Sequence, residues 1–337
     1  MEKTLIKFDR VNDSFLDHLH INYYMYKNCK FNCDYCFIVG NNRSDRWKSR
    51  VKTRIPTLDD QVSVLDNLLK INKKWSLYVY GGEPTEYKHL HDTIEYIIHN
   101  KTEHLFEIEL QTNLSGSIKE LYKFKHYDDF VISPTIHYKL ISDIGISEII
   151  NRLNWLNDQS LLRRVDVAMY GHDVDIYLNL DTALKNTDYY DKVIYLYNYI
   201  ETNTNSGGLN SHSDIEDVYT GRFNHNGRYD KILSGLKPTN RELYRLEYDD
   251  GTTEVADMNE LVTRDISFKG WTCDAGKNLM LVEYTGDWWV CDVKNFKESP
   301  EGNLIERPYK FLSRTYNNTK CNMNKCDGCF YIKKLDL

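Results

Sequence analysis

The sequence contains no long apolar run, at its start or anywhere else. Its first 20 residues lack an apolar core of signal-peptide length, and no later stretch is long enough to span a bilayer. We therefore expect a cytoplasmic protein without a membrane partner.

An excess of basic charge is also missing. The chain has 43 basic and 50 acidic residues, which gives a net charge of −7. Extended contact with a nucleic-acid backbone needs a basic face, so the total argues against a nucleic-acid partner and leaves only a local patch as a route. The hydrophobic content of 41% is that of a folded globular protein.

Cysteine is absent between Cys36 and Cys273. An even spread of cysteines in a secreted chain would suggest disulfides, whereas two tight groups in a cytoplasmic chain indicate metal or cluster ligation. The N-terminal group is Cys29, Cys33 and Cys36, and the C-terminal group is Cys273, Cys291, Cys321, Cys326 and Cys329.

Between about residues 18 and 200, short apolar strands alternate with amphipathic helices. Phe106, Ile108 and Leu110 show the period of a strand, and Thr57 with Asp60 has the spacing of a helix capping box. The pattern predicts strands over 20–25, 76–80, 105–111, 130–136, 165–170 and 193–199, and helices over 57–70, 90–97 and 146–156.

Repeated strand–helix units predict an α/β fold with a parallel sheet. Six units are too few for a closed eight-fold barrel, so we expect an open, partial (β/α)6 barrel over 1–200, with ligands at the carboxyl ends of its strands. Residues 201–265 are expected to form a linking region, with a hairpin over 244–255. Residues 266–337 are expected to form a small cysteine-rich α+β module with a hairpin over 280–290.

The N-terminal cysteines directly follow the first predicted barrel strand. Three thiolates on one loop can hold three irons of a cubane cluster and leave the fourth iron open for a chelating cofactor. The alternative is a zinc knuckle, which needs a fourth ligand, and neither cysteine nor histidine lies at normal finger spacing.

The C-x3-C-x2-C spacing, with Tyr35 before the last cysteine, resembles the radical S-adenosylmethionine (radical SAM) superfamily. Gly81-Gly82-Glu83-Pro84 strengthens the resemblance because it follows one strand–helix unit later, where the family has this motif. The resemblance implies a [4Fe–4S] cluster whose open iron binds S-adenosylmethionine. It also implies reductive cleavage of that cofactor to a 5′-deoxyadenosyl radical, and a reductase or flavodoxin-type electron donor.

The same resemblance suggests further contacts with the cofactor. It implies that Tyr35 is a cofactor-binding residue and that the stretch from Gly81 to Pro84, with Gly82 and Glu83, binds the amino group. It also implies that Asn113 and Ser133, at strand ends, contact the ribose and carboxylate. Strand ends also carry Asn and Ser as caps and turns, so a structural role remains open for both. For Arg164, a surface role is favoured over a pairing with the cofactor carboxylate.

In the C-terminal group, the spacing from Cys273 through Gly286 to Cys291 resembles the opening half of SPASM and twitch modules. The resemblance implies one auxiliary [4Fe–4S] cluster of the twitch type. Four ligands complete a cubane, so five cysteines exceed one cluster by one. Cys273 and Cys291 are expected as ligands, with Cys326 and Cys329 next and Cys321 as a replacement or spare. The alternative is a zinc ribbon.

We therefore expect an enzyme that abstracts hydrogen from an unactivated C–H bond, most simply of a peptide or protein. The alternatives are the same chemistry on a small metabolite, a non-catalytic zinc-binding module, and a nucleic-acid-modifying member of the superfamily. The acid–base candidates are side chains after the fourth and fifth strands, namely His137, Tyr138, Tyr170, His172 and Asp173.

Overall fold

The structure is a computed structural model. It describes residues 3–10, 18–31, 33, 55–169, 174–197, 243–257, 268–291, 299–313, 319–321 and 334–335. Seven of the candidate site residues lie outside this part of the chain, and they are Tyr35, Cys36, Tyr170, His172, Asp173, Cys326 and Cys329.

The main sheet has nine strands within the described residues, in the order β13-β12-β11-β2-β3-β4-β5-β6-β7. Strands β2 to β7 are all parallel to their neighbours, which confirms the predicted partial barrel of parallel strands. They are β2 (Leu19–Tyr26), β3 (Trp75–Gly81), β4 (Leu105–Thr112), β5 (Phe130–His137), β6 (Val165–Met169) and β7 (Val193–Tyr197).

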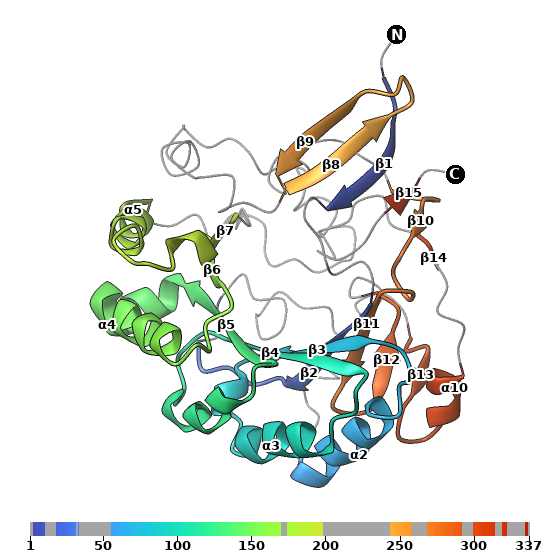
Figure 1. Cartoon of the computed structure of the whole chain (residues 1–337), viewed down its shortest axis with the longest axis horizontal. Coiled ribbons are helices and arrows are strands. Elements are labelled where there is room, and N and C mark those ends of the chain that lie inside the picture. Colours follow the sequence, from blue (N-terminus) through green and yellow to red (C-terminus); the bar gives the residue numbers. More distant parts are fainter. Residues whose placement is uncertain are drawn as a thin grey trace, which may run out of the picture.

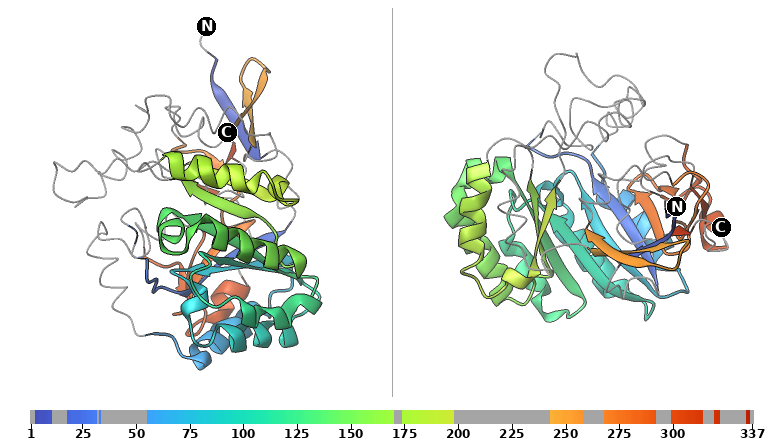
Figure 2. Two further views of the ribbon diagram at one scale, coloured as in Figure 1. Left: turned by 90° about the vertical axis from the view of Figure 1, so that its left-hand side faces the viewer. Right: turned by 90° about the horizontal axis from the view of Figure 1, so that it is seen from above.

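Helices cover one face of this sheet, as Figures 1 and 2 show. They are α2 (Leu58–Leu68), α3 (Leu90–Asn100), α4 (Tyr138–Asp158) and α5 (Val174–Leu184), with the short 3₁₀ turns η2 (Pro84–Glu86), η3 (Lys119–His126) and η4 (Tyr190–Lys192). The predicted capping box is present, because Thr57 and Asp60 exchange side-chain-to-backbone hydrogen bonds at the start of α2.

Helix α4 begins at Tyr138, earlier than the predicted start at 146. The helical geometry breaks at Gly145, whose φ of 77° and ψ of 160° lie outside the helical region. Glycine has no Cβ and tolerates positive φ, so the chain changes direction there and resumes as a helix. The strong apolar periodicity resumes only after this break, and for that reason the sequence pattern located the second part alone.

Alternation along the strands separates an apolar face from a polar one. Leu77 and Val79 of β3, with Ile108 and Leu110 of β4, are fully buried in the core that the helices cover. Burial of each such side chain contributes about 1.5–3 kcal/mol. The intervening residues point to the helix-free interior of the partial barrel, where β4 presents Glu109.

Strand β11 (Leu279–Glu283) extends the sheet beyond β2. It pairs with β2 in parallel, from Leu279 opposite His20 to Glu283 opposite Tyr24. The antiparallel strands β12 (Asp287–Trp289) and β13 (Gly302–Asn303) follow, with helix α10 (Pro308–Leu312) beside them. The predicted hairpin over 280–290 is confirmed, with Gly286 at φ 85° in its turn. Its pairing with the first barrel strand was not predicted.

A second, antiparallel sheet has the order β14-β10-β15-β1-β8-β9 among the described residues and brings both ends of the chain together. Its strands are β1 (Leu5–Arg10), β8 (Leu243–Tyr248), β9 (Thr253–Asp257), β10 (Thr272–Cys273), β14 (Thr319–Lys320) and β15 (Lys334–Leu335). The β8–β9 hairpin matches the one predicted over 244–255, whereas β1 was missed. Among the described helices, none is both long and apolar enough to cross a membrane.

Candidate functional site

The chain leaving β2 and the chain leaving β3 lie against each other at the carboxyl edge of the sheet. The Gly82 N–H donates to the Tyr26 carbonyl over 2.6 Å, and the Glu83 N–H donates to the Asn28 carbonyl over 2.8 Å. A Cβ on Gly81 would lie 1.9 Å from the Tyr26 oxygen, and one on Gly82 would lie 2.1 Å from the Asn28 oxygen. Both positions therefore require glycine, because backbone atoms occupy the space of any side chain.

Glu83 ties this edge to the end of β4. Its carboxylate is fully buried and accepts hydrogen bonds from the Thr112 hydroxyl over 2.6 Å and from the Asn113 N–H over 2.6 Å. The Thr85 N–H and hydroxyl also donate to it, over 2.9 and 2.5 Å. Burial raises the pKa of Glu83, while these hydrogen bonds act in the opposite direction. The carboxylate thus holds the ends of β3 and β4 together.

Asn113 completes the link to the N-terminal cysteines. Its side-chain N–H donates to Cys29 Sγ over 3.4 Å, and its Oδ1 accepts from the Ser115 N–H over 2.8 Å, which fixes the orientation of the amide. Cys33 is buried against the main core, and Cys29 packs at its margin. Thiols on one loop, with an amide N–H aimed at a sulfur atom, are the donor set that an iron–sulfur cluster uses.

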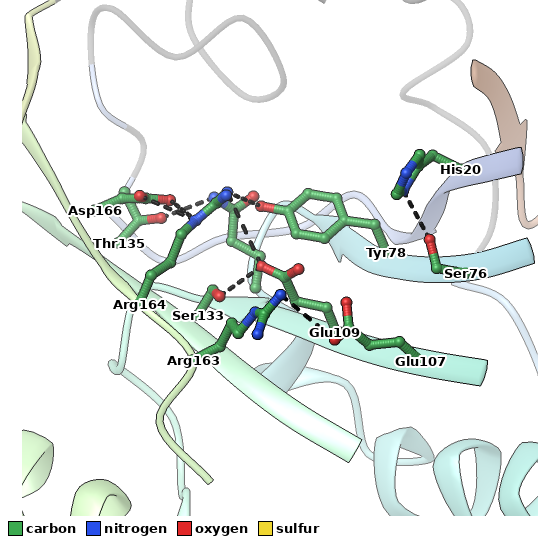
Figure 3. Close-up of polar contacts among 11 residues, drawn as sticks. His20, Ser76, Tyr78, Glu107, Glu109, Ser133, Thr135, Arg163, Arg164 and Asp166 are labelled. Carbon is green, nitrogen blue, oxygen red and sulfur yellow. Dashed lines mark hydrogen bonds and ion pairs between the residues drawn. The ribbon is translucent and has the colours of Figure 1, made fainter. Parts of the chain in front are cut away.

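Ser133 belongs to a different set of contacts, inside the barrel. It lies in the middle of β5, is fully buried, and its hydroxyl donates to Glu109 over 2.5 Å. Arg164 lies within 3.9 Å of Glu109 and 3.2 Å of Asp166, and it donates to the Tyr78 hydroxyl over 3.5 Å (Figure 3). Its side chain is 16% exposed, so the predicted surface role for Arg164 is wrong. Tertiary contacts with carboxylates draw it inward.

Of the acid–base candidates, the described residues include His137 and Tyr138. His137 ends β5 and alternates in phase with Ser133, which places it on the interior side of the sheet. Burial lowers the pKa of His137 to about 4, so its imidazole is neutral at physiological pH and can accept a proton. Tyr138 begins α4 and packs against the main core.

Three of the C-terminal cysteines are described. Cys273 lies in β10, and Cys321 follows β14, the antiparallel neighbour of β10. The Cys321 N–H donates to the Trp271 carbonyl over 2.8 Å, so the pairing continues past β14 and sets Cys273 and Cys321 diagonally opposite. Such diagonal residues are about 7–8 Å apart on one face of a sheet.

Strand pairing also places Cys291 near the turn that follows Cys273. It comes two residues after Trp289, whose partner in the hairpin is Leu281, so it lies toward the start of β11. The turn from Cys273 into β11 is closed by a hydrogen bond from the Gly276 N–H to the Leu279 carbonyl over 2.8 Å. The Ala275 N–H donates to Cys273 Sγ over 3.4 Å, a second amide-to-sulfur contact.

Residues 23–159 match the family model described as the radical SAM superfamily. This part of the chain is a radical SAM domain. The matched region runs from β2 into the end of α4, and it contains the N-terminal cysteines, the glycines after β3 and Asn113. No curated protein sequence matches the chain.

The similarity to solved structures extends beyond the residues that match the family model. Streptococcus suis SuiB bound to S-adenosylmethionine is 14% identical with a TM-score of 0.51, over 89% of this chain and 66% of that one. Histidine-tagged anSMEcpe with bound AdoMet is 15% identical with a TM-score of 0.53, over 88% and 78%. The chain spans slightly less than two thirds of the SuiB length. At these identities the likeness shows the fold.

Several residues that shape the radical SAM site were not identified from the sequence. Thr112 and Glu109 lie in a strand whose alternation was recognised. Nothing in that pattern showed that the Thr112 hydroxyl would bind Glu83, or that the Glu109 carboxylate would be buried rather than exposed. Lys27 and Glu283 form an ion pair across 256 sequence positions, and single-sequence reasoning has no signal for such a contact. The only local cue was the position of Lys27, immediately upstream of the cysteines.

The close backbone approach predicts the effect of Gly82→Ala. The added methyl group would meet backbone atoms of Lys27 and Asn28, which cannot move without shifting the approach to Cys29. We expect the free energy of unfolding to fall by at least about 2 kcal/mol, together with a loss of iron bound at the N-terminal cysteines. Urea unfolding and iron analysis after anaerobic reconstitution measure the two effects.

Gly251→Ala is the matched control. Its Cβ meets nothing within 4 Å, although its φ of 79° is positive. The control should cost about 1 kcal/mol and leave the iron content unchanged. Equal iron content in the two variants would show that the approach of Gly82 does not shape the cysteine loop.

The lowered pKa of His137 predicts a loss of stability in mild acid. The unfolded chain takes up a proton as the pH falls through 6.5, whereas the folded chain does so only near pH 4. Stability contributed by the neutral imidazole is therefore present above pH 6.5 and is lost between pH 6.5 and 4, by at most about 3 kcal/mol. Urea unfolding across this range should show a flatter pH profile for His137→Gln, whereas the exposed His99→Gln should follow the parent protein. Identical pH profiles for all three proteins would contradict the lowered pKa of His137.

Proposed function

We propose that the chain is a radical SAM enzyme that generates a 5′-deoxyadenosyl radical and abstracts hydrogen from an unactivated C–H bond. The observation that carries the proposal is the convergence of three segments at the carboxyl edge of the sheet. Gly82 contacts the chain before Cys29, Glu83 holds the end of β4, and Asn113 donates to the Cys29 sulfur. A binding module without catalysis, zinc-stabilised or not, has no use for this arrangement.

Cys29, Cys33 and Cys36 would hold a [4Fe–4S] cluster, termed here the N-terminal cluster. When bound, it supplies an electron that cleaves S-adenosylmethionine to methionine and the 5′-deoxyadenosyl radical. The protein's part is positional and electrostatic. The Asn113 amide lowers the electron density on the Cys29 sulfur, which would make the cluster easier to reduce. The two glycines let the chain before Cys29 pack closely against the end of β3.

The remaining cofactor contacts keep their expected roles in the proposal. The stretch from Gly81 to Pro84 would bind the amino group, while the Glu83 carboxylate accepts hydrogen bonds from Thr85, Thr112 and Asn113. Tyr35, Asn113 and Ser133 remain candidates for contacts to the cofactor. A reductase or flavodoxin-type protein would supply the electron.

For the substrate we propose a peptide or protein, with a small polar metabolite as the second candidate. The interior face of the barrel presents hydrogen-bonding side chains, including Tyr78, Gln111 and Thr135, and Tyr78 also packs against a small apolar cluster that includes Leu281 and Trp289. Amide groups of a peptide backbone and hydroxyl groups of a metabolite both suit such a face. His137, neutral at physiological pH, is one described candidate for a proton acceptor on this face.

The combined change of Cys29, Cys33 and Cys36 to Ala tests the proposed chemistry. Removal of all three thiolates leaves the N-terminal cluster without protein ligands, so formation of 5′-deoxyadenosine from S-adenosylmethionine under reducing conditions should stop. Product analysis by chromatography measures it. Cys321→Ala is a control with the same change of residue type, in the C-terminal group. Continued 5′-deoxyadenosine formation by the triple variant would exclude radical SAM chemistry at these cysteines.

We also propose one auxiliary [4Fe–4S] cluster in the C-terminal module, residues 266–337, which residues 201–265 connect to the radical SAM domain at 1–200. Cys273 and Cys321 are diagonal neighbours in one sheet, and Cys291 follows the hairpin that the Cys273 turn enters. This placement supports Cys321 as a ligand with Cys273 and Cys291. One of Cys326 and Cys329 would complete the set of four, and a zinc ribbon is the alternative occupant.

Metal analysis of the same triple variant tests the auxiliary cluster. The parent protein should hold about eight irons and the triple variant about four, because the C-terminal ligands are untouched. Cys273→Ala and Cys321→Ala, made in the triple background, should each lower the remaining iron sharply. Zinc in place of iron in the triple variant would contradict the auxiliary cluster and would leave the proposal for the N-terminal cluster intact.

A further inference from the structure

A buried ion pair joins the chain before the N-terminal cysteines to the C-terminal hairpin. Lys27 Nζ donates to Glu283 Oε2 over 2.8 Å, and the two side chains are only 4% and 2% exposed. The ammonium group also lies 5.5 Å from the centre of the Tyr284 ring. The partners come from opposite ends of the sequence, and strands β2 and β11 bring them side by side (Figure 1).

The Lys27 side of the pair is part of the segment that leads to Cys29. On the backbone, the carbonyls of Tyr26 and Asn28, on either side of Lys27, accept the hydrogen bonds from Gly82 and Glu83. The Lys27 side chain makes its contact with a different element, the end of β11. Residues 26–28 are therefore fixed by two sets of contacts. The chain leaving β3 contacts them through backbone hydrogen bonds, and β11 contacts them through the Lys27–Glu283 ion pair.

The Glu283 side of the pair is rigid. Glu283 is the last residue of β11 and lies opposite Tyr24 in the parallel ladder, and the next N–H, that of Tyr284, donates to the Tyr24 carbonyl over 3.0 Å. The Glu283 carbonyl accepts from the Gly286 N–H over 2.8 Å in the hairpin turn. A carboxylate on such a fixed backbone gives the lysine one position rather than a range of positions.

We propose that Glu283, through Lys27, is a positioning residue for the N-terminal cluster, so that the C-terminal hairpin sets the geometry of the cysteine loop. This inference rests on the proposed function, because it takes Cys29 to be a cluster ligand. A buried ion pair contributes little net stability compared with apolar residues of similar size, yet loss of one partner leaves an uncompensated charge. The value of this pair is therefore the fixed direction that it gives to Lys27.

Hydrogen exchange of the Gly82 and Glu83 amides gives a direct measure of this positioning, because both donate to the segment that Lys27 belongs to. In Glu283→Gln, exchange of these two amides should accelerate at least about tenfold, while amides in the centre of α3 keep their rates. Glu247→Gln is the matched control, since it removes the same charge from the 2.9 Å ion pair that Glu247 makes with Lys7 in the other sheet, where both side chains are more exposed.

A double variant, Lys27→Met with Glu283→Leu, separates positioning from stability. Apolar partners of similar volume should restore the unfolding midpoint, since no buried charge is left without a partner. The amide exchange should nevertheless stay fast, because an apolar contact has no preferred direction. Parent-like exchange in the double variant, or in Glu283→Gln itself, would overturn the proposal.

Addition of S-adenosylmethionine to the reduced, reconstituted proteins provides a second readout. The cofactor changes the electron paramagnetic resonance spectrum of a cluster with an open iron, so the change reports the N-terminal cluster. The S-adenosylmethionine concentration that gives half of the spectral change should rise at least about tenfold in Glu283→Gln and in the double variant, but not in Glu247→Gln. Unchanged half-saturation with a lowered unfolding midpoint would reduce the pair to a structural role. No response in the parent protein would instead contradict the proposed function, and the amide exchange would still decide the positioning role.

Discussion

Strand β2 is hydrogen-bonded in parallel to β3 on one side and to β11 on the other. Both ladders run toward the carboxyl end of β2, where the chain continues to the N-terminal cysteines. A central strand has little freedom, because a shift of one residue would turn its buried side chains to the wrong face. The position of Cys29 therefore depends on the register of β2 with β3 and β11, and β11 comes from the far end of the sequence.

Charge inside the barrel is tolerated because the charged groups meet one another. Glu109 and Asp166 are buried carboxylates, and each lies near Arg164 or accepts a hydroxyl. Isolated carboxylates in such surroundings would be costly, whereas a satisfied network holds its members in fixed orientations. A rigid polar interior suits the proposed chemistry, in which a reactive species must meet one bond of the substrate and no other.

The two cysteine groups are separate in sequence but are joined through the fold. The turn after Cys273 leads directly into β11, and β11 lies against the strand that precedes Cys29. The C-terminal hairpin and the chain before Cys29 therefore share one ladder of backbone hydrogen bonds. Each cysteine group keeps its own ligands for iron, while the parallel pairing of β2 and β11 links the C-terminal hairpin to the chain before Cys29.

The sequence by itself determined the parallel strands, the capping box of α2, the β8–β9 and β11–β12 hairpins and the segments that carry the radical SAM motifs. These features depend on short-range periodicity, on turn residues and on motif spacing, all of which are local. Only the tertiary structure decided that Arg164 points inward, that Asn113 faces the Cys29 sulfur, and that β11 lies beside β2. It also brought Lys27 to Glu283. Such contacts join residues from distant parts of the chain, and their partners are selected by burial and register, which no local pattern records.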